Sequence, residues 1–267
     1  GASVLMTGSE LRNCRVTEAS VSDGNIAHGV FCVNGRIVDC LFDHNWNNGG
    51  HTVGGGVLAL GQSSFVDRCV FTNNNSKSFH HWRQYKVAVA AVYDGTVRNC
   101  LVAHNNYGIA DVVGTGTLAV GLYAEAATVE NCTVVSNRYT SKKGDHPNAA
   151  AGICATAGAR IVNCVVDANM TPTSTADTTP MPFNWYLSGN STFSYCATSP
   201  LENLGGDGNF IPVEGDWISL PGRRAVLPLG SGLVGKGVNL PWSDAALDLY
   251  GGARHVGRRV DVGCLED

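Results

Sequence analysis

A short block built around a cysteine recurs six times in this chain of 267 residues. The copies are LRNCRV at 11–16, IVDCLFDHN at 37–45, VDRCVFTNN at 66–74, VRNCLVAHN at 97–105, VENCTVVSN at 129–137 and IVNCVVDAN at 161–169. Successive cysteines are 26, 29, 31, 32 and 32 residues apart, and Cys196 follows 32 residues after the last one. A period of this length is typical of solenoids and related repeat proteins. The repeat therefore predicts a stack of equivalent units.

Each copy of the block has the spacing of a strand that bends. Apolar residues lie three positions before the cysteine and two after it, as Ile37 and Phe42 do around Cys40. Inward residues three positions apart cannot share one face of a straight strand, so the chain must turn between them. The residue before the cysteine is asparagine in four of the six copies, with Asp39 and Arg68 in the others. Because asparagine tolerates the left-handed backbone conformation, we expect a corner at this position.

A second asparagine follows five residues after the cysteine in five copies, and we expect a second corner there. These residues are Asn45, Asn74, Asn105, Asn137 and Asn169. With a further short strand before each block, every coil holds three strands, and stacking at about 4.8 Å forms internal ladders of Cys, Val and Asn. The pattern predicts an all-β protein, a right-handed parallel β-helix of about seven three-strand coils over residues 1–196. Leucine-rich and propeller repeats fit less well, since they need regular leucines or about four strands per longer repeat.

These blocks resemble the right-handed β-helix repeats of large bacterial secreted and surface proteins with the pectin-lyase-like fold. The end of the chain resembles the D-x-x-G-x-x-R and D-x-G-x-x-E ending of such proteins, through Asp248, Gly251, Arg254, Asp261, Gly263 and Glu266. The resemblance implies a C-terminal capping region at 197–267, in which residues 209–220 and 260–266 add strands to the last coil. Since the first repeat begins close to residue 1, we expect the β-helix to be N-terminally truncated and part of a longer protein, with its signal peptide outside this sequence.

Charge and hydropathy argue against two classes of partner. The net charge is −4 and Lys and Arg form no block, so the basic surface of a nucleic-acid-binding protein is missing. No apolar run reaches the roughly 20 residues that cross a bilayer. We therefore expect no nucleic-acid partner and no membrane span.

The ten cysteines allow two interpretations. Stacked cysteines are close enough to form disulfides in an exported protein. Alternatively, a cysteine that recurs at one inward position acts as a small buried hydrophobe, and this is the interpretation we favour. Ladder positions run in a line and do not converge as the ligands of a zinc site do, so we expect no metal and no cofactor.

Segments of variable length follow the second corner at 46–55, 75–88, 106–119, 138–150 and 170–183, and we expect them to form loops along one edge. Binding residues concentrate in loops on rigid scaffolds. The candidate ligand-binding residues are His80, His81, Trp82, Arg83, Tyr85, Lys86, Tyr107, Tyr139, Lys142, Lys143 and His146. Aromatic rings beside cationic side chains suit a neutral or acidic glycan. The alternative is that Trp82 and Tyr85 only pack their loop onto the coil below.

The sequence predicts an extracellular or cell-surface module, non-catalytic and adhesin-like, that binds carbohydrate. The alternative is a polysaccharide lyase or glycoside hydrolase. A lyase would use a basic residue as proton acceptor, for which Lys86 with Arg83, or Lys142 with Lys143, are the candidates. The motifs of the resembled family's polygalacturonase-type hydrolases are absent, and no catalytic residue is assigned. A third hypothesis is a purely structural segment of a larger protein.

Overall fold

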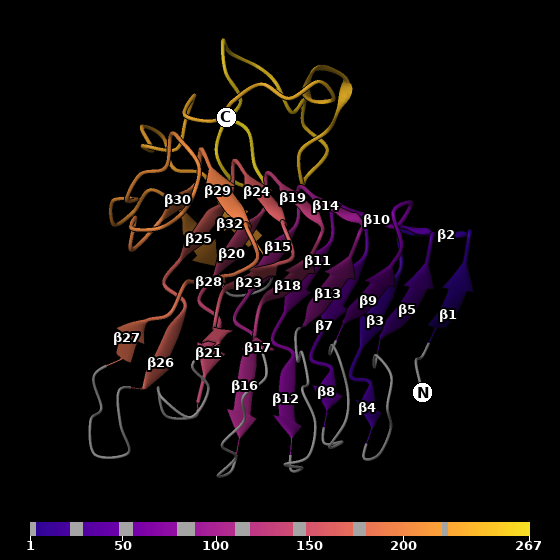
Figure 1. Cartoon of the computed structure of the whole chain (residues 1–267). Helices are drawn as coiled ribbons and strands as arrows, with labels where there is room; N and C mark the ends of the chain where they lie inside the picture. The colour runs from indigo at the N-terminus through magenta and orange to yellow at the C-terminus, as the bar shows by residue number, and fades with distance from the viewer. Residues whose placement is uncertain are drawn as a thin grey trace.

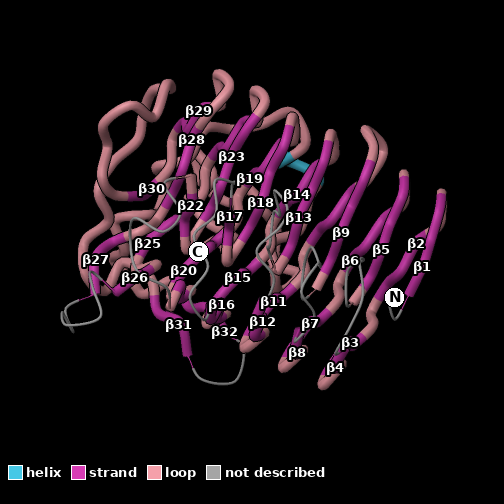
Figure 2. Tube along the Cα trace, turned by 60° about the horizontal axis from the view of Figure 1, so that its bottom comes forward, coloured by secondary structure: helices cyan, strands magenta, loops and turns pink. Residues whose placement is uncertain are grey.

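The computed structural model describes residues 4–21, 29–47, 56–78, 89–109, 118–140, 148–172, 180–220 and 224–267. Within these ranges the regular structure is β-strand apart from one 3-10 turn, η1, at Ser243–Ala245. The strands build a parallel β-helix, which confirms the predicted fold class (Figures 1 and 2). No helix in the described part of the chain is long and apolar enough to cross a membrane.

Three parallel sheets of seven strands each run along the solenoid. The first contains β1 Val4–Thr7, β5 Val30–Val33, β9 Val57–Leu60, β13 Ala90–Tyr93, β18 Leu122–Glu125, β23 Ile153–Thr156 and β28 Trp185–Leu187. The second contains β2 Glu10–Arg12, β6 Arg36–Val38, β10 Phe65–Asp67, β14 Thr96–Arg98, β19 Thr128–Glu130, β24 Arg160–Val162 and β29 Thr192–Ser194. The third contains β3 Arg15–Thr17, β7 Leu41–Asp43, β11 Val70–Thr72, β15 Leu101–Ala103, β20 Thr133–Val135, β25 Val165–Asp167 and β30 Ala197–Thr198.

All strands of a fourth sheet except β4 lie within the segments that we expected to be loops. It contains β4 Ser20–Val21, β8 Trp46–Asn47, β12 Asn75–Ser78, β16 Asn106–Ile109, β21 Arg138–Tyr139, β26 Met170–Pro172 and β27 Pro180–Pro182. The chain continues as a strand here because each coil still pairs with its neighbour: the Asn75 amide donates to the Asn45 carbonyl at 2.9 Å. A further pair, β17 Leu118–Ala119 with β22 Ala149–Ala150, precedes two strands of the first sheet. The first six coils therefore have a fourth strand beyond the three we predicted, and the last coil, β28 to β30, has three.

Equivalent residues of successive blocks lie directly above one another. Val66 pairs with Ile37 on one side and Val97 on the other, so the predicted inward positions stack in register. The rings of Phe42 and Phe71 are parallel, with centroids 4.7 Å apart. These side chains belong to one continuous buried core inside the solenoid.

The first predicted corner is confirmed in every copy. The residue before each cysteine has a positive φ of 48–55°: Asn13, Asp39, Arg68, Asn99, Asn131 and Asn163. The second corner lies one residue earlier than predicted, since His44 and Asn73, not the asparagines that follow them, have positive φ. The backbone turns at that residue and directs the following asparagine into the core.

The inward asparagines form a hydrogen-bonded ladder. Asn74 Oδ1 accepts from the backbone amide of Asn45 at 3.1 Å and from its Nδ2 at 2.9 Å. Asn74 Nδ2 donates to the Phe42 carbonyl and to Asn105 Oδ1, both at 3.0 Å. The ladder is made of Asn45, Asn74, Asn105, Asn137, Asn169 and Asn184, none more than 2% exposed. Because the side-chain amide of each ladder residue has hydrogen-bond partners, the ladder avoids the cost of about 1–3 kcal/mol that an unsatisfied buried polar group carries.

The block cysteines form a second ladder. Cys40, Cys69, Cys100, Cys132, Cys164 and Cys196 are at most 2% exposed, and none of the ten cysteines forms a disulfide in the structure. The Cys132 amide donates to Cys164 Sγ at 3.4 Å. Burial raises the pKa of the Cys132 and Cys164 thiols, so both remain protonated at neutral pH. The structure thus agrees with the buried-hydrophobe interpretation.

Residues 199–267 form a C-terminal segment that first extends the last coil and then turns back along the solenoid (Figure 1). Phe210 forms a parallel bridge with Ala197, and further on β31 Ile218–Leu220 pairs with β32 Arg224–Val226 as an antiparallel hairpin. Residues 260–266 do not add a strand to the last coil as we expected. The Cys264 amide donates to Thr133 Oγ1 at 3.0 Å, so this stretch lies on an earlier coil.

The C-terminal segment covers the third sheet because that sheet is apolar on its outside. Leu101, Val135 and Val165 face outward and are buried against Leu233 and Val262 of the segment. A strand that kept polar residues at these outward positions would give the segment nothing to bury. Side packing, as well as end coverage, therefore holds residues 199–267 in place.

The residues of the predicted C-terminal motif lock the segment together. The guanidinium of Arg254 is fully buried and donates to the carbonyls of Leu265 at 3.0 Å and Asp261 at 2.7 Å. It also lies 3.4 Å from the carboxylate of Glu266. Gly263 has a φ of +105° and packs so closely on Thr133 that a side chain at this position would clash. These residues therefore stabilise the C-terminal segment through buried contacts.

Candidate functional site

The outer face of the first sheet is formed by strands that follow the predicted ligand-binding segments in the sequence. In β13, Ala90 and Val92 belong to the core, whereas Ala91 and Tyr93 face outward. The same alternation places Tyr123 and Glu125 of β18 on the outside. In the sequence, residues 79–88 are followed by Val89 and then by β13. Residues 141–147 are followed by Asn148 and then by β22 and β23.

Four outward residues on three adjacent strands form the outer-face cluster, which consists of Tyr93, Tyr123, Glu125 and Thr156. The Tyr123 hydroxyl lies 2.6 Å from Glu125 Oε2 and 3.0 Å from Thr156 Oγ1. The rings of Tyr93 and Tyr123 have centroids 5.6 Å apart and are tilted by 44°. Tyr123 is only 1% exposed, whereas Tyr93, Glu125 and Thr156 are partly exposed. The cluster therefore presents one aromatic ring, a carboxylate and a hydroxyl to a ligand, with the buried Tyr123 beneath them.

The electrostatics of the cluster fix the protonation of its phenols. Burial, followed by the hydrogen bond with Glu125, raises the pKa of Tyr123. Burial and the charge of Glu125 likewise raise the pKa of Tyr93. Both phenols are therefore neutral near pH 7, and Tyr123 donates its proton to the Glu125 carboxylate. A neutral phenol serves as a hydrogen-bond donor and not as a proton acceptor.

The structure describes only two of the eleven candidate ligand-binding residues. Nine lie outside the described residues: His80, His81, Trp82, Arg83, Tyr85, Lys86, Lys142, Lys143 and His146. Tyr107 and Tyr139 are described, and the structure differs from our expectation for both. They lie in β16 and β21 of the fourth sheet, are 3% and 1% exposed, and stack with centroids 6.0 Å apart. Their rings pack inward because the fourth sheet continues the coil, so they offer no free face to a ligand.

Our sequence interpretation missed the outer-face cluster. It identified the strands before each block but considered only their inward residues. Alternation along a strand predicts that Tyr93, Tyr123 and Glu125 face outward, since Val92, Leu122 and Ala124 face the core. A signal for the cluster was thus present in the sequence.

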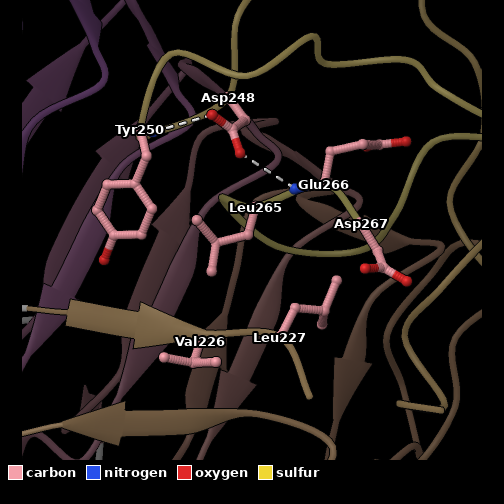
Figure 3. A pocket seen from close by; sticks show the side chains of 7 residues that line it. All are labelled: Val226, Leu227, Asp248, Tyr250, Leu265, Glu266 and Asp267. Atoms are coloured by element: carbon pink, nitrogen blue, oxygen red, sulfur yellow. Dashed lines mark hydrogen bonds between the residues drawn. The ribbon is translucent and has the colours of Figure 1, made fainter. Parts of the chain in front are cut away.

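A pocket of about 510 Å³ lies in the C-terminal segment (Figure 3). It is lined by Val226, Leu227, Asp248, Tyr250, Leu265, Glu266 and Asp267. Asp248 Oδ1 accepts from the backbone amides of Tyr250 at 2.9 Å and Gly252 at 2.8 Å. Glu266 accepts from the Asp261 amide at 3.1 Å and faces Arg254. Two of its three carboxylates therefore support the fold, which makes this pocket the weaker candidate.

Comparisons with known proteins assign no relative. No protein-family model matches the chain, and no curated protein matches it in sequence. The fold and the side chains of the two surfaces are consequently the basis for any functional conclusion. Among the described residues, no group of three or more His, Cys, Asp or Glu side chains is placed to hold a metal ion.

Proposed function

We propose that this chain is an extracellular or cell-surface β-helix module that binds an extended glycan along the outer face of its first sheet, without catalysing a reaction. The observation that carries the proposal is the outer-face cluster. The partly exposed ring of Tyr93 suits the apolar face of a sugar, and the neighbouring Glu125 and Thr156 side chains suit its hydroxyls. The buried Tyr123 holds the Glu125 carboxylate in place through its hydrogen bond. Pectin-lyase-like character and a bacterial surface origin, which the repeat blocks suggest by resemblance, are part of the same proposal.

The repeat of the solenoid supports an extended ligand. Equivalent outward positions recur at about 4.8 Å from coil to coil, a spacing comparable with the length of one sugar ring. Outward residues in register from Phe31 through Leu58 to Ala91 continue the surface away from the cluster. A linear glycan could therefore contact several coils at once, each through a similar position.

The cluster favours binding over catalysis. A lyase needs a group that accepts a proton, and the raised pKa of Tyr123 keeps its phenol protonated. Glu125 is the nearest carboxylate to that phenol, and it accepts the Tyr123 proton as a hydrogen bond at 2.6 Å. The pair is arranged to hold a fixed geometry, as a preformed binding surface requires.

Calorimetric titration with neutral and uronate-containing oligosaccharides of increasing length tests the proposal. We expect affinity to rise with length, and Tyr93→Ala to weaken binding by about threefold to tenfold, since an aromatic contact contributes about 0.5–1.5 kcal/mol. Tyr250→Ala is the matched control, because Tyr250 is a half-exposed tyrosine that lines the pocket of the C-terminal segment, away from the outer-face cluster. Binding that Tyr93→Ala leaves unchanged, or no binding to any glycan, would refute the proposal.

The same samples separate the enzymatic alternative. Incubation with each glycan should yield neither unsaturated products nor new reducing ends. Turnover that disappears in Glu125→Gln would instead identify a polysaccharide-cleaving enzyme and overturn the non-catalytic assignment.

A further inference from the structure

A smaller pocket, of about 310 Å³, lies where the C-terminal segment meets the end of the solenoid. It is lined by Tyr195, Gly208, Phe210, Lys236 and Arg259. Tyr195 occupies the first-corner position after β29, with a φ of 53°. The volume is at the lower end of the range for small-molecule sites and is large enough for a ligand the size of one sugar.

The guanidinium of Arg259 is held in place before any ligand arrives. Its Nε donates to the Gly237 carbonyl at 2.7 Å, and its Cζ lies 5.5 Å from the centre of the Tyr195 ring. Gly208 packs against the same ring so closely that a Cβ would come within 2.6 Å of it. Tyr195 is therefore fixed between backbone and cation, and the terminal nitrogens of Arg259 remain available for an anion.

The charges of this pocket are not neutralised by the protein. Lys236 and Arg259 are exposed, and neither forms an ion pair with any residue that the structure describes. No carboxylate is among the lining residues. Arg68, Arg98 and Arg254 each face a carboxylate, whereas Arg15, Arg160 and Arg258 resemble Arg259 in having no ion pair with a described residue. The pocket differs from those positions in placing two such cations beside aromatic rings. Two uncompensated cations beside the aromatic Phe210 are complementary to an organic anion.

We propose that this pocket binds a small organic anion with the size of one carboxylated sugar, a uronate. The carboxylate pairs with the terminal nitrogens of Arg259 and the ammonium of Lys236, and Phe210 and the edge of Tyr195 contact the ring. This site lies in a different part of the fold from the outer-face cluster. The proposal therefore does not depend on glycan binding along the first sheet.

Titration of the full chain with glucuronate, followed by nuclear magnetic resonance, tests the site. We expect saturable shifts at Lys236, Arg259 and Phe210, and none at these residues with glucose. Lys236→Ala should weaken the binding at least fivefold, because it removes one of the two cations of the pocket. The variant should fold, since the Lys236 side chain makes no hydrogen bond with a described residue and its backbone bond to Leu233 is retained. Arg259→Gln should weaken it further. Arg258→Ala is the matched control, since this exposed neighbour does not line the pocket.

Several outcomes of this titration would overturn the proposal. Equal shifts with glucose, unchanged affinity in both Lys236→Ala and Arg259→Gln, or no saturation with glucuronate would overturn it. If inorganic phosphate binds as tightly as glucuronate, the sugar ring contributes nothing to the affinity, and the proposed contacts of Phe210 and Tyr195 with that ring are wrong. Tyr93→Ala should leave glucuronate binding unchanged, so a failure here is distinguishable from a failure of the glycan surface.

Discussion

The corner before the block cysteine has the same left-handed backbone at both ends of the β-helix but different side chains. Toward the N-terminus it holds Asp39 and Arg68, whose carboxylate and guanidinium pair through two contacts of 2.7 and 3.0 Å. Toward the C-terminus it holds Asn131 and Asn163, which contact the C-terminal segment. Asn163 accepts from the Val238 amide at 2.8 Å and donates to its carbonyl at 2.9 Å.

The difference shows what selects the residue at a corner. The backbone requires only a residue that tolerates a positive φ, so an uncovered corner can hold Asn13, Asp39 or Arg68, whereas a covered corner must also satisfy the segment above it. Where the C-terminal segment lies against the corner, an amide that both donates and accepts can satisfy buried backbone groups of the segment. Where no such cover exists, charged residues remain partly in water: the Asp39 side chain is 28% exposed. Asp39 and Arg68 are thus uncovered members of the row, as is the exposed Asn13.

Arg254→Met should have the largest effect on this comparison. It removes the buried guanidinium that holds two carbonyls and faces Glu266, so the covered corners should lose the segment. We expect a loss of about 3–5 kcal/mol in the free energy of unfolding, as for a buried ion pair deprived of one partner. Urea denaturation measures it, with the exposed Arg258→Met as control. A loss as small as that of the control would show that the motif does not lock the segment.

Asn163→Asp should cost about 1–3 kcal/mol, because the buried Val238 carbonyl loses its donor and a charge is placed under the segment. The measurement is the shift of the urea midpoint. Faster proteolysis within residues 199–267 should accompany it. If Asn163→Asp were as stable as the wild type, the amide contacts would not explain the asparagine.

Asp39→Asn should cost less than about 1 kcal/mol, since a partly exposed ion pair contributes little. The loss should shrink further when the ionic strength is raised, because salt screens exposed charges. Thermal unfolding at low and high salt measures both effects. A cost equal to that of Asn163→Asp would remove the distinction between covered and uncovered corners.

The smallest expected effect is a pH dependence confined to the C-terminal segment. The hydrogen bond to Asp244 raises the pKa of His255 from its ordinary value of 6.5. The stabilisation is therefore fully present below pH 6.5 and is lost as the pH rises through the higher folded-state pKa. Asp244→Asn should abolish this dependence. The measurement is the melting temperature of each variant between pH 5 and 9. Asp39→Asn should leave it intact.

The sequence predicted the features that depend on local periodicity. The block cysteines stack as expected, and even Arg68, the residue least suited to a positive φ, adopts one of 48° because its neighbours in the row impose the corner. The second corner was misplaced by one residue, since a spacing of five does not reveal which residue turns. His44 turns, and Asn45 faces inward.

Long-range packing could not be predicted from the repeats. The placement of residues 260–266 against Thr133 depends on contacts across 131 residues, which no local pattern encodes. The outer-face cluster was accessible in principle, because Tyr93 and Glu125 follow the alternation of their strands. The inward packing of Tyr107 and Tyr139 was not, since it required knowing that a fourth sheet continues the coil.

Cysteine alkylation of the native protein, read by mass spectrometry, tests the stacked architecture most directly. Cys14 of the first coil is only partly buried, whereas the six cysteines from Cys40 to Cys196 that form the ladder are at most 2% exposed. We predict that Cys14 reacts in the folded state and that these six react together only when denaturant unfolds the chain. Rapid reaction of several ladder cysteines in the native protein would contradict the fold described here.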